Sequence, residues 1–452
     1  MECRSIVRRE MLGEYKAELR NAKLLYILMS TLLIADWVVP QYFGVHIGVD
    51  FTATRILNLL ILAYFFMNRK VGNHFLKSIL DVQVTPYLLL YMCVMVYTTI
   101  LRVNVNTFFL NFLDILTFYM VYYGIRYVIG VKKSIDWTVK IAWVLGIYGI
   151  VEYVLGYSPM VKFLRTLPYN NVISVYRSGS YRIMGPCGHS IGYGLMLELL
   201  LVLICIDYDK DEMNLFKHPF LYCVLMINMF LTGSRLALGF AIIESALIVL
   251  FSKKQTRKKN IFILTLFLIA FVVFEVVIFK TSLGQYIMMQ IASLIDEALG
   301  TEYAALFGAD TTWLAESTSY RRYLPKIFGV EWLNPLVGRG ANASLGFEID
   351  GVYLKSIDNF YVALYIRYAY PGLMTYVLFF LATIISMVKK YIQNHSGVCI
   401  ALAIGMTSYC VSLYWVDYLQ TTKYMYILIA IFFAFCDEKA RRKDSLLVTE
   451  EA

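Results

Sequence analysis

The sequence is poor in charged residues and in proline for a chain of 452 residues. Lys, Arg, Asp and Glu together make up 16% of it, and it holds 9 prolines. Soluble globular chains carry roughly 25% charged residues, and disordered or collagen-like chains are much richer in charge or proline. The composition therefore excludes a soluble enzyme, a disordered tail and a collagen.

Closely spaced cysteines are also absent. None of the 8 cysteines forms a C-x-x-C pair, and most lie within apolar runs. Neither a disulfide framework nor a zinc site is indicated, and we expect no metal and no cofactor. Cys187 lies in a loop, where a free thiol is the expected state.

Apolar residues are abundant instead: 59% of the chain is hydrophobic and 16% is aromatic. A helix needs about 20 apolar residues to cross a membrane. Reading for such runs predicts an all-α, polytopic membrane protein with about twelve transmembrane helices in one domain, residues 24–436. The predicted spans are 24–44, 52–67, 82–101, 107–128, 137–156, 188–207, 219–232, 235–251, 260–279, 358–388, 396–415 and 422–436.

The basic residues indicate how these spans are oriented. Connectors 68–78, 126–140, 208–218, 252–260 and 389–395 carry 16 Lys and Arg, whereas connectors 45–51, 102–106 and 416–423 carry only Arg102 and Lys423. Basic connectors stay on the cytoplasmic side, so we expect both termini inside the cell. The net charge of +9 then reflects topology, not nucleic-acid binding. The basic arm 1–23 is predicted to lie on the inner membrane surface without being a cleavable signal, and 437–452 to be a cytoplasmic tail.

Two predicted outer loops depart from the charge pattern or from ordinary loop length. Residues 157–187 contain four Lys and Arg but no Asp or Glu, against the bias elsewhere. Residues 280–357 are too many for a simple connector. Within them, a helical stripe of Ile287, Ile291, Leu294 and Ala298 indicates an amphipathic helix on the outer leaflet.

Four basic residues and one acid on the predicted outer side form the candidate site. Arg182 precedes the sixth span, Arg235 opens the eighth, Arg321 and Arg322 lie in the long loop, and Asp358 opens the tenth. Guanidinium groups match phosphate oxygens and keep their charge, so this set suits a lipid-linked diphosphate. Asp358 can accept a proton from an attacking hydroxyl. Spacing does not choose between Arg321 and Arg322.

Other side chains near these motifs are candidate substrate contacts. On a helical projection Tyr361, Tyr365 and Ala369 share the face of Asp358, and tyrosine combines an apolar ring with a hydroxyl that suits sugars. The remaining candidates are Arg177, His189, Arg339 and Asn359.

Structural roles compete with these assignments. Asp358 is at a helix start, where Asp is a favoured N-cap, and one residue can do both. Arg235 can satisfy nearby carbonyls, His189 can be a hydrogen-bonded structural residue, and Arg339 can close its loop. The acids Asp36 and Asp114 lie within apolar runs. Acids at such positions are candidate functional residues, but pairing with a neighbouring helix is equally expected here.

Four stretches of the sequence resemble the Wzy/WaaL superfamily of O-antigen polymerases and ligases. In order, they are R-I-M-G-P-C-G-H-S-I-G from 182, L-T-G-S-R-L-A-L from 231, N-P-L-V-G-R-G from 334 and D-N-F-Y-V-A-L-Y-I-R-Y-A-Y-P-G-L from 358. The resemblance implies a fold related to the GT-C glycosyltransferases. It also implies a metal-independent reaction on undecaprenyl-diphosphate-linked oligosaccharides at the outer face of the bacterial plasma membrane, with Arg182, Arg235 and Arg321 or Arg322 holding the diphosphate.

Within the superfamily, Asp358-Asn359 resembles the polymerase branch, because ligases have His at the first position and tend to have Gly where this chain has Ala369. We therefore expect an inverting glycosyltransferase that polymerises repeat units for O-antigen, capsule or exopolysaccharide. A chain-length regulator and a flippase are candidate partners. A ligase remains the alternative, and a transporter or flippase is a third, disfavoured because the sequence shows neither paired repeats nor broken helices.

Overall fold

The computed structural model describes residues 21–103, 105–168, 176–177, 180–309, 321, 323–341, 347–349, 351–354, 357–417 and 421–450. In these ranges the protein is mostly helical. Its strands are four short antiparallel hairpins, which pair β1 Gly44–His46 with β2 Asp50–Thr52, β3 Tyr176–Arg177 with β4 Ser180–Tyr181, β5 Ile206–Asp207 with β6 Glu212–Met213, and β7 Phe347–Ile349 with β8 Val352–Leu354.

Each of the twelve predicted apolar runs coincides with a helix. These are Asn21–Val38, α2 Ala53–Met67, α4 Thr85–Arg102, α5 Val105–Tyr123 with a π-helical turn Gly124–Ile129, α6 Val131–Leu155, α8 Ser190–Ile204, α9 Pro219–Leu231, α10 Arg235–Phe251, α11 Lys254–Ile278, α14 Phe360–Asn394, α15 Gly397–Ser412 and α16 Thr422–Glu450.

By length and composition, six of the described helices are able to cross a membrane: Asn21–Val38, the helix through Asn111–Ile129, and α4, α6, α11 and α14. Four shorter apolar helices, α2, α8, α9 and α15, accompany them. The chain is thus a helical protein with several membrane-crossing candidates.

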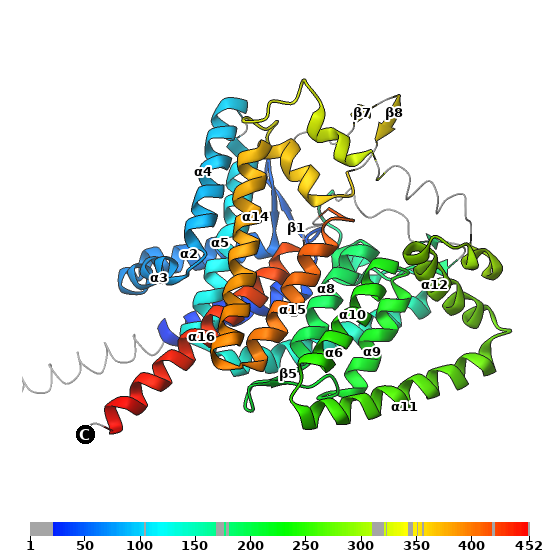
Figure 1. The fold of residues 1–452 in the computed structure, drawn as a ribbon. Coiled ribbons are helices and arrows are strands. Elements are labelled where there is room, and N and C mark those ends of the chain that lie inside the picture. The colour runs from blue at the N-terminus through cyan, green and yellow to red at the C-terminus, as the bar shows by residue number, and fades with distance from the viewer. Residues whose placement is uncertain are drawn as a thin grey trace, which may run out of the picture.

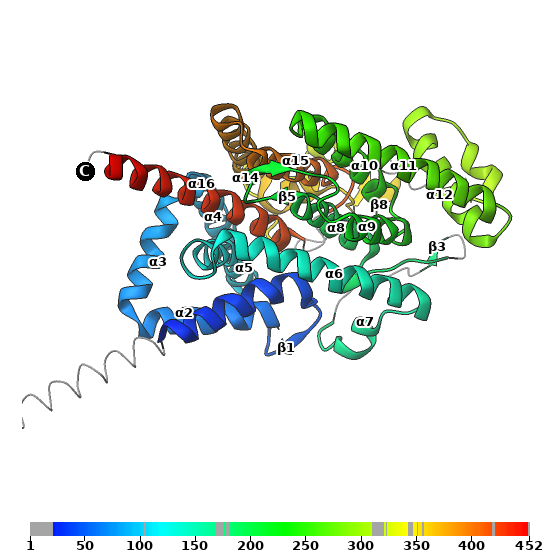
Figure 2. The same cartoon turned by 90° about the horizontal axis from the view of Figure 1, so that it is seen from below.

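The helix α8 lies at the centre of the bundle. It packs against α6, α9, α10, α15 and α16, and all of its residues except Ile191 are buried (Figure 2). In contrast, α11 runs along the periphery (Figure 1), and only 6% of its most apolar stretch is buried inside the protein. Exposing apolar surface to water costs about 25 cal/mol per Å², so a helix this exposed and this apolar fits a lipid environment.

The connector predicted at 68–78 is mostly a helix, α3 Arg69–Asp81, which contributes Phe75 and Ser78 to the interior. Residues 437–450 of the predicted cytoplasmic tail continue α16 as a helix, which ends at Glu450. At this end of the bundle Asp211 lies in the β5–β6 turn. It accepts a 2.6 Å hydrogen bond from Ser396 and forms an ion pair with Lys439, so it joins the start of α15 to α16.

The opposite end of the bundle carries the two predicted outer loops and is called the loop end below (Figure 1). Loop 157–187 contains α7 Pro159–Leu164, β3, β4 and a 3₁₀ turn Gly185–Cys187. Loop 280–357 contains α12 Ser282–Leu299, 3₁₀ segments Tyr303–Phe307 and Leu324–Gly329, and the β7–β8 hairpin. The predicted amphipathic helix is therefore confirmed as α12. Its Ile287, Ile291 and Leu294 are half-buried, while the Ala298 side chain lies outside the described part.

The helix α14 is broken at Ala369, whose φ of 54° and ψ of −165° are not helical. Pro371 follows, and proline cannot donate the hydrogen bond that an unbroken helix requires. The backbone groups of α14 that lose their helical partners at the break bond to segment 334–340. Arg339 N donates to Ile366 O (2.9 Å), Gly340 N to Arg367 O (2.9 Å) and Tyr370 N to Pro335 O (3.1 Å). The N-P-L-V-G-R-G motif thus completes the backbone hydrogen bonding of a broken helix.

Two sequence expectations about this helix are wrong. The chain does contain a broken helix, although none was expected. The projection that placed Ala369 on the face of Asp358 also fails, because α14 begins only at Phe360 and loses its helical geometry at Ala369.

Candidate functional site

The loop that carries Arg182 is held by a buried carboxylate of α6. Glu152, which is fully buried, accepts hydrogen bonds from Met184 N (2.8 Å), Gly185 N (3.0 Å) and the Tyr181 hydroxyl (2.9 Å). Ile183 N donates to Leu231 O (3.1 Å), which joins this loop to the end of α9. The position of Arg182 is therefore fixed from both sides.

Arg182 is buried, at 7% exposed, and its Nε donates to Thr232 O at 2.7 Å. Burial, together with the positive charge of Arg235 nearby, lowers the pKa of Arg182 to about 10. Gly233 has a φ of 57°, and a Cβ there would lie 3.1 Å from Arg182 Nε. Glycine at 233 therefore serves both the tight turn and the close passage of the guanidinium.

Arg235 is the first residue of α10, where the Ser234 hydroxyl caps the helix by accepting from Ala237 N. Its guanidinium lies 3.1 Å from Glu297 of α12, so it pairs with a carboxylate instead of satisfying carbonyls. The positive charges of Arg182 and Arg321 each interact with the charge of Arg235. Three of the four predicted arginines are thus neighbours at the loop end.

Arg321 also approaches the predicted catalytic acid, because its Nη2 lies 3.9 Å from Asp358 Oδ2. An ion pair this long and partly exposed contributes at most about 1 kcal/mol, so an anionic ligand can replace the Asp358 carboxylate beside Arg321 at low cost. Asp358 is not the helix cap. That role belongs to Asn359, whose Oδ1 accepts from Val362 N at 3.1 Å.

His189 is a candidate contact close to both groups. Its ring interacts electrostatically with Arg182 and with Asp358. Its Nδ1 accepts from Ile191 N at 3.2 Å and caps α8. The structural role expected for His189 is therefore confirmed, and the residue also forms part of the wall of the cluster.

Three other candidate contacts have structural partners elsewhere. The Tyr361 hydroxyl donates to Cys410 O (2.6 Å), and Tyr365, at 3% exposed, packs against Phe328 with ring centroids 4.9 Å apart. The Arg339 guanidinium lies over the Trp332 ring, 5.3 Å from its centroid. Of Arg177 only the backbone pairing in β3 is described, and Arg322 lies outside the described residues, so Arg321 alone of the two is placed here.

Arg182, Arg235, Arg321, Asp358 and His189 are called the arginine cluster below. Its three guanidinium groups face two carboxylates, Asp358 within the cluster and Glu297 of α12 beside it. One positive charge is left in excess, and more becomes available where an anion displaces a carboxylate from its arginine. Among the described residues no carboxylate forms an ion pair with Arg182. In the same part of the chain, no group of three or more His, Cys, Asp or Glu is arranged to hold a metal ion.

Sequence reasoning missed two acids that shape this site. Glu152 lies within a predicted span, and an acid there is a signal that it serves a specific partner. Glu297 lies on α12, whose sequence pattern was interpreted only as a lipid-facing stripe. Of the two intramembrane acids that were noted, Asp114 behaves as the structural alternative expects, since it pairs with Arg55 of α2 at 2.7 Å. Asp36 is fully buried and lines the same small cavity as Lys423 of α16.

Comparison with known proteins adds no assignment to this geometry. No family model matches the chain, and no curated protein matches it.

Proposed function

We propose that the protein is a glycosyltransferase that polymerises oligosaccharide repeat units linked to undecaprenyl diphosphate at the outer face of the bacterial plasma membrane. The observation that carries this proposal is the arginine cluster, in which three guanidinium groups gather beside one carboxylate, Asp358. The proposal includes the finer topology: twelve spans, a GT-C-like bundle, both termini in the cytoplasm, and the loop end facing outward. The resemblance of the four motifs supports the same function.

In the proposed reaction, the growing chain is the donor and the incoming lipid-linked unit is the acceptor. The acceptor hydroxyl oxygen forms a bond to the anomeric carbon, and the bond from that carbon to the diphosphate oxygen breaks. The hydroxyl proton passes to the Asp358 carboxylate, which acts as general base. A single displacement of this kind inverts the anomeric centre.

The guanidinium groups act on the leaving diphosphate. Charge develops on the bridging oxygen as the bond breaks, and fixed positive charges in a site with little water stabilise it. Arg182 contributes most to this stabilisation. It is buried, and Thr232 O, Gly233 and the loop held by Glu152 fix its position before substrate binds. Arg235 and Arg321 exchange their carboxylate partners for phosphate oxygens.

The test is the surface glycan of cells that carry single substitutions. We expect Asp358→Asn and Arg235→Ala each to lower polymer by about a hundred-fold or more, as for the loss of a base or of an anion-stabilising donor. Asp50→Asn, a loop-end carboxylate outside the cluster, is the matched control and should leave polymer unchanged. The amount of each variant in the membrane is measured alongside.

The kind of product that accumulates distinguishes the alternatives. Loss of a polymerase leaves single lipid-linked units, whereas loss of a ligase leaves long lipid-linked chains. A flippase deletion leaves single units that stay on the cytoplasmic side. Normal amounts of full-length polymer in the Asp358→Asn cells would refute the proposed chemistry.

A further inference from the structure

Two adjoining cavities lie beside α14, away from the arginine cluster. The smaller has a volume of about 60 Å³ and lies between the helix Asn21–Val38, α2, α5 and α16. The larger, of about 240 Å³, lies between α4, α5, α14 and α16. Both are lined by Asn111, Asp114, Thr422 and Tyr426, so they adjoin, and together they are called the α4–α14 cavity below. The larger volume lies a little below the lower limit of ligand pockets, roughly 300 Å³.

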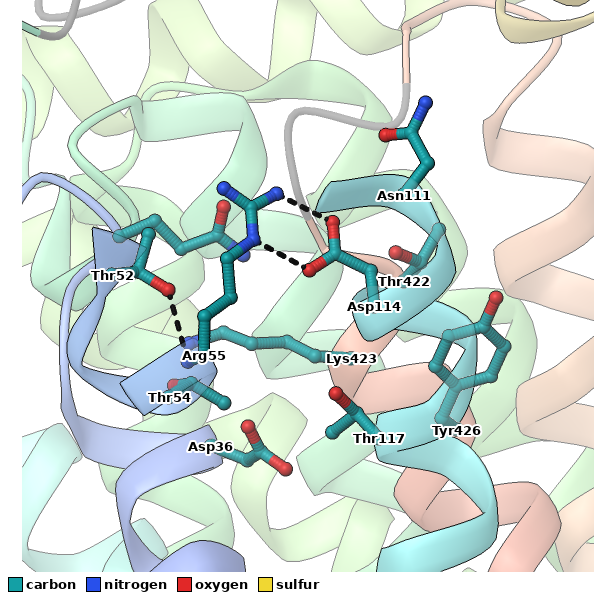
Figure 3. A pocket seen from close by; sticks show the side chains of 11 residues that line it. Asp36, Thr52, Thr54, Arg55, Asn111, Asp114, Thr117, Thr422, Lys423 and Tyr426 are labelled. Atoms are coloured by element: carbon teal, nitrogen blue, oxygen red, sulfur yellow. Dashed lines mark hydrogen bonds and ion pairs between the residues drawn. The ribbon is translucent and has the colours of Figure 1, made fainter. Parts of the chain in front are cut away.

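The charged groups around this cavity are balanced. Figure 3 shows the Arg55 guanidinium directed at the Asp114 carboxylate, with two hydrogen bonds of 3.0 and 2.7 Å. Lys423 and the fully buried Asp36 influence each other. On the α14 side, Arg367 pairs with Asp417 at 3.3 Å. Since Arg55 and Arg367 each pair with an acid, neither guanidinium leaves its charge uncompensated in the cavity, and an added buried charge would be costly.

The rest of the lining consists of aromatic rings, neutral hydrogen-bonding groups and the apolar side chains of Met95, Ile115, Ala341 and Leu364. Tyr91 packs edge-on against Tyr368 and Tyr376, with centroids 5.6 and 4.8 Å apart. The Asn111 amide donates to the Tyr368 hydroxyl at 3.1 Å, and the Tyr376 and Tyr426 hydroxyls lie 3.3 Å apart. Rings that carry hydroxyls, together with amides, offer both an apolar face and hydrogen bonds. That combination fits a neutral ligand rich in hydroxyl groups.

The cavity shares a wall with the arginine cluster. Phe360, Leu364, Arg367 and Tyr368 of α14 line it, and their spacing of four, three and one places them on one face of the helix. Asp358 comes only two residues before Phe360. The N-terminus of α14 is fixed there, because Phe360 N bonds to Leu413 O and Val416 O. Tyr361 and Tyr365, which the sequence favoured as sugar contacts, are not among the residues that line the cavity.

We propose that the α4–α14 cavity binds one neutral sugar residue, the acceptor sugar whose hydroxyl is delivered to Asp358. The role as acceptor site rests on the proposed glycosyl transfer, whereas binding of a neutral sugar rests on the cavity itself. In this arrangement the two substrates lie on two sides of α14, with the diphosphate on the arginine cluster and the acceptor sugar in the cavity.

The experiment measures two probes on the full chain in phosphatidylcholine nanodiscs. Saturation-transfer NMR follows D-glucose, D-galactose and N-acetyl-D-glucosamine, and calorimetric titration follows inorganic pyrophosphate. We expect at least one sugar to bind. Asn111→Ala and Tyr426→Phe should each weaken it by about two- to ten-fold, as for the loss of one hydrogen bond. Ala341→Phe, which fills the cavity without removing a polar group, should abolish sugar binding.

Pyrophosphate binding separates this inference from the proposed function. The three cavity variants should bind pyrophosphate as the wild type does, whereas Arg182→Ala and Arg235→Ala should lose pyrophosphate and keep the sugar. Asn394→Ala, an exposed asparagine at the far end of α14, is the matched control for Asn111→Ala. The inference is overturned if no sugar binds, if all variants bind sugar equally, or if sugar binding follows the arginines. Failure of pyrophosphate binding in the wild type counts against the proposed function alone.

Discussion

The docking of segment 334–340 onto the break in α14 gives a quantitative prediction at Gly338. A Cβ at this position would lie 2.1 Å from Arg367 O, 2.3 Å from Arg367 C and 2.4 Å from Tyr368 N. All three atoms belong to the backbone of α14, so no side chain can move aside to make room. Gly338→Ala must therefore push the segment away from the helix.

The magnitude follows from the contacts that would be lost. Overpacking costs about 1–3 kcal/mol, and the three backbone hydrogen bonds from Arg339, Gly340 and Tyr370 contribute about 0.5–1.5 kcal/mol each. With a Cβ 2.1 Å from the Arg367 carbonyl oxygen the docked geometry cannot be kept, so we expect local undocking, which loses the three hydrogen bonds at a cost of about 1.5–4.5 kcal/mol. Since 1.4 kcal/mol is a factor of about ten, hydrogen exchange at these three amides should accelerate at least ten-fold.

Hydrogen exchange followed by mass spectrometry checks this prediction on peptides covering 334–341 and 366–372. Gly329→Ala is the matched control, because a Cβ at 329 meets nothing within 4 Å. Arg102 Nε, which donates to Gly338 O at 2.8 Å, and the Tyr97 hydroxyl, which donates to Leu336 O at 2.6 Å, hold the same segment from α4. Unchanged exchange in Gly338→Ala would refute the docking described here.

Three further predictions concern α14 and α12. Ala369→Gly relieves a positive φ that costs about 1–3 kcal/mol but adds about 0.5–1 kcal/mol of chain entropy, so the thermal midpoint in detergent should rise, and a fall would contradict the strain. Glu297→Gln frees Arg235 from its carboxylate and should tighten pyrophosphate binding by about two- to five-fold, which titration measures; weaker binding would show that Glu297 supports the site. Burial raises the pKa of Asp296, but hydrogen bonds from Thr301, Ala304 and Tyr303 outweigh it and leave the pKa below its ordinary value of 3.8. The stability that Asp296 contributes is therefore present above pH 3.8 and lost as the pH falls below it. The protection factors of the amides in the turn after α12, which correct for the pH dependence of intrinsic exchange, should therefore fall below that pH in the wild type, and Asp296→Asn should remove this fall.

The positions of the helices could be predicted from the sequence because an apolar run of span length leaves the backbone few alternatives to a helix. The exceptions are instructive. The helix α3 was missed because its Arg69, Lys70 and Lys77 mark it as a charged connector, and only a narrow stripe including Phe75 is buried. The break in α14 had a signal in Pro371, but a hydropathy reading averages over a single proline.

The candidate site was predictable in its members but not in its pairings. Arg182, Arg235 and Asp358 could be grouped because each stands at a predicted helix boundary on the same side. Two acids hold this arrangement: Glu152 binds the loop that carries Arg182, and Glu297 pairs with Arg235. Both are distant in sequence from the arginines and belong to elements with no visible link to them. Long-range pairing of this kind depends on how helices pack, which helical periodicity does not specify. The same reason explains why the sequence pointed to Tyr361 and Tyr365 as aromatic contacts of α14 and did not point to Phe360 and Tyr368, which line the cavity.

The break in α14 explains how one helix serves two neighbouring sites. Up to Tyr368 the helix presents Phe360, Leu364 and Tyr368 to the α4–α14 cavity, and at Ala369 the backbone leaves the helical path. Carbonyls freed near the membrane must find new donors, and segment 334–340 supplies them. Because that segment leads directly to Ala341 in the cavity lining, the backbone repair of the helix also contributes to the cavity wall. Asp358 pairs with Arg321 and comes two residues before the cavity-lining Phe360. It therefore adjoins both a site with excess positive charge and a cavity in which Arg55 and Arg367 are paired with acids, which is the arrangement that a charged donor and a neutral acceptor require.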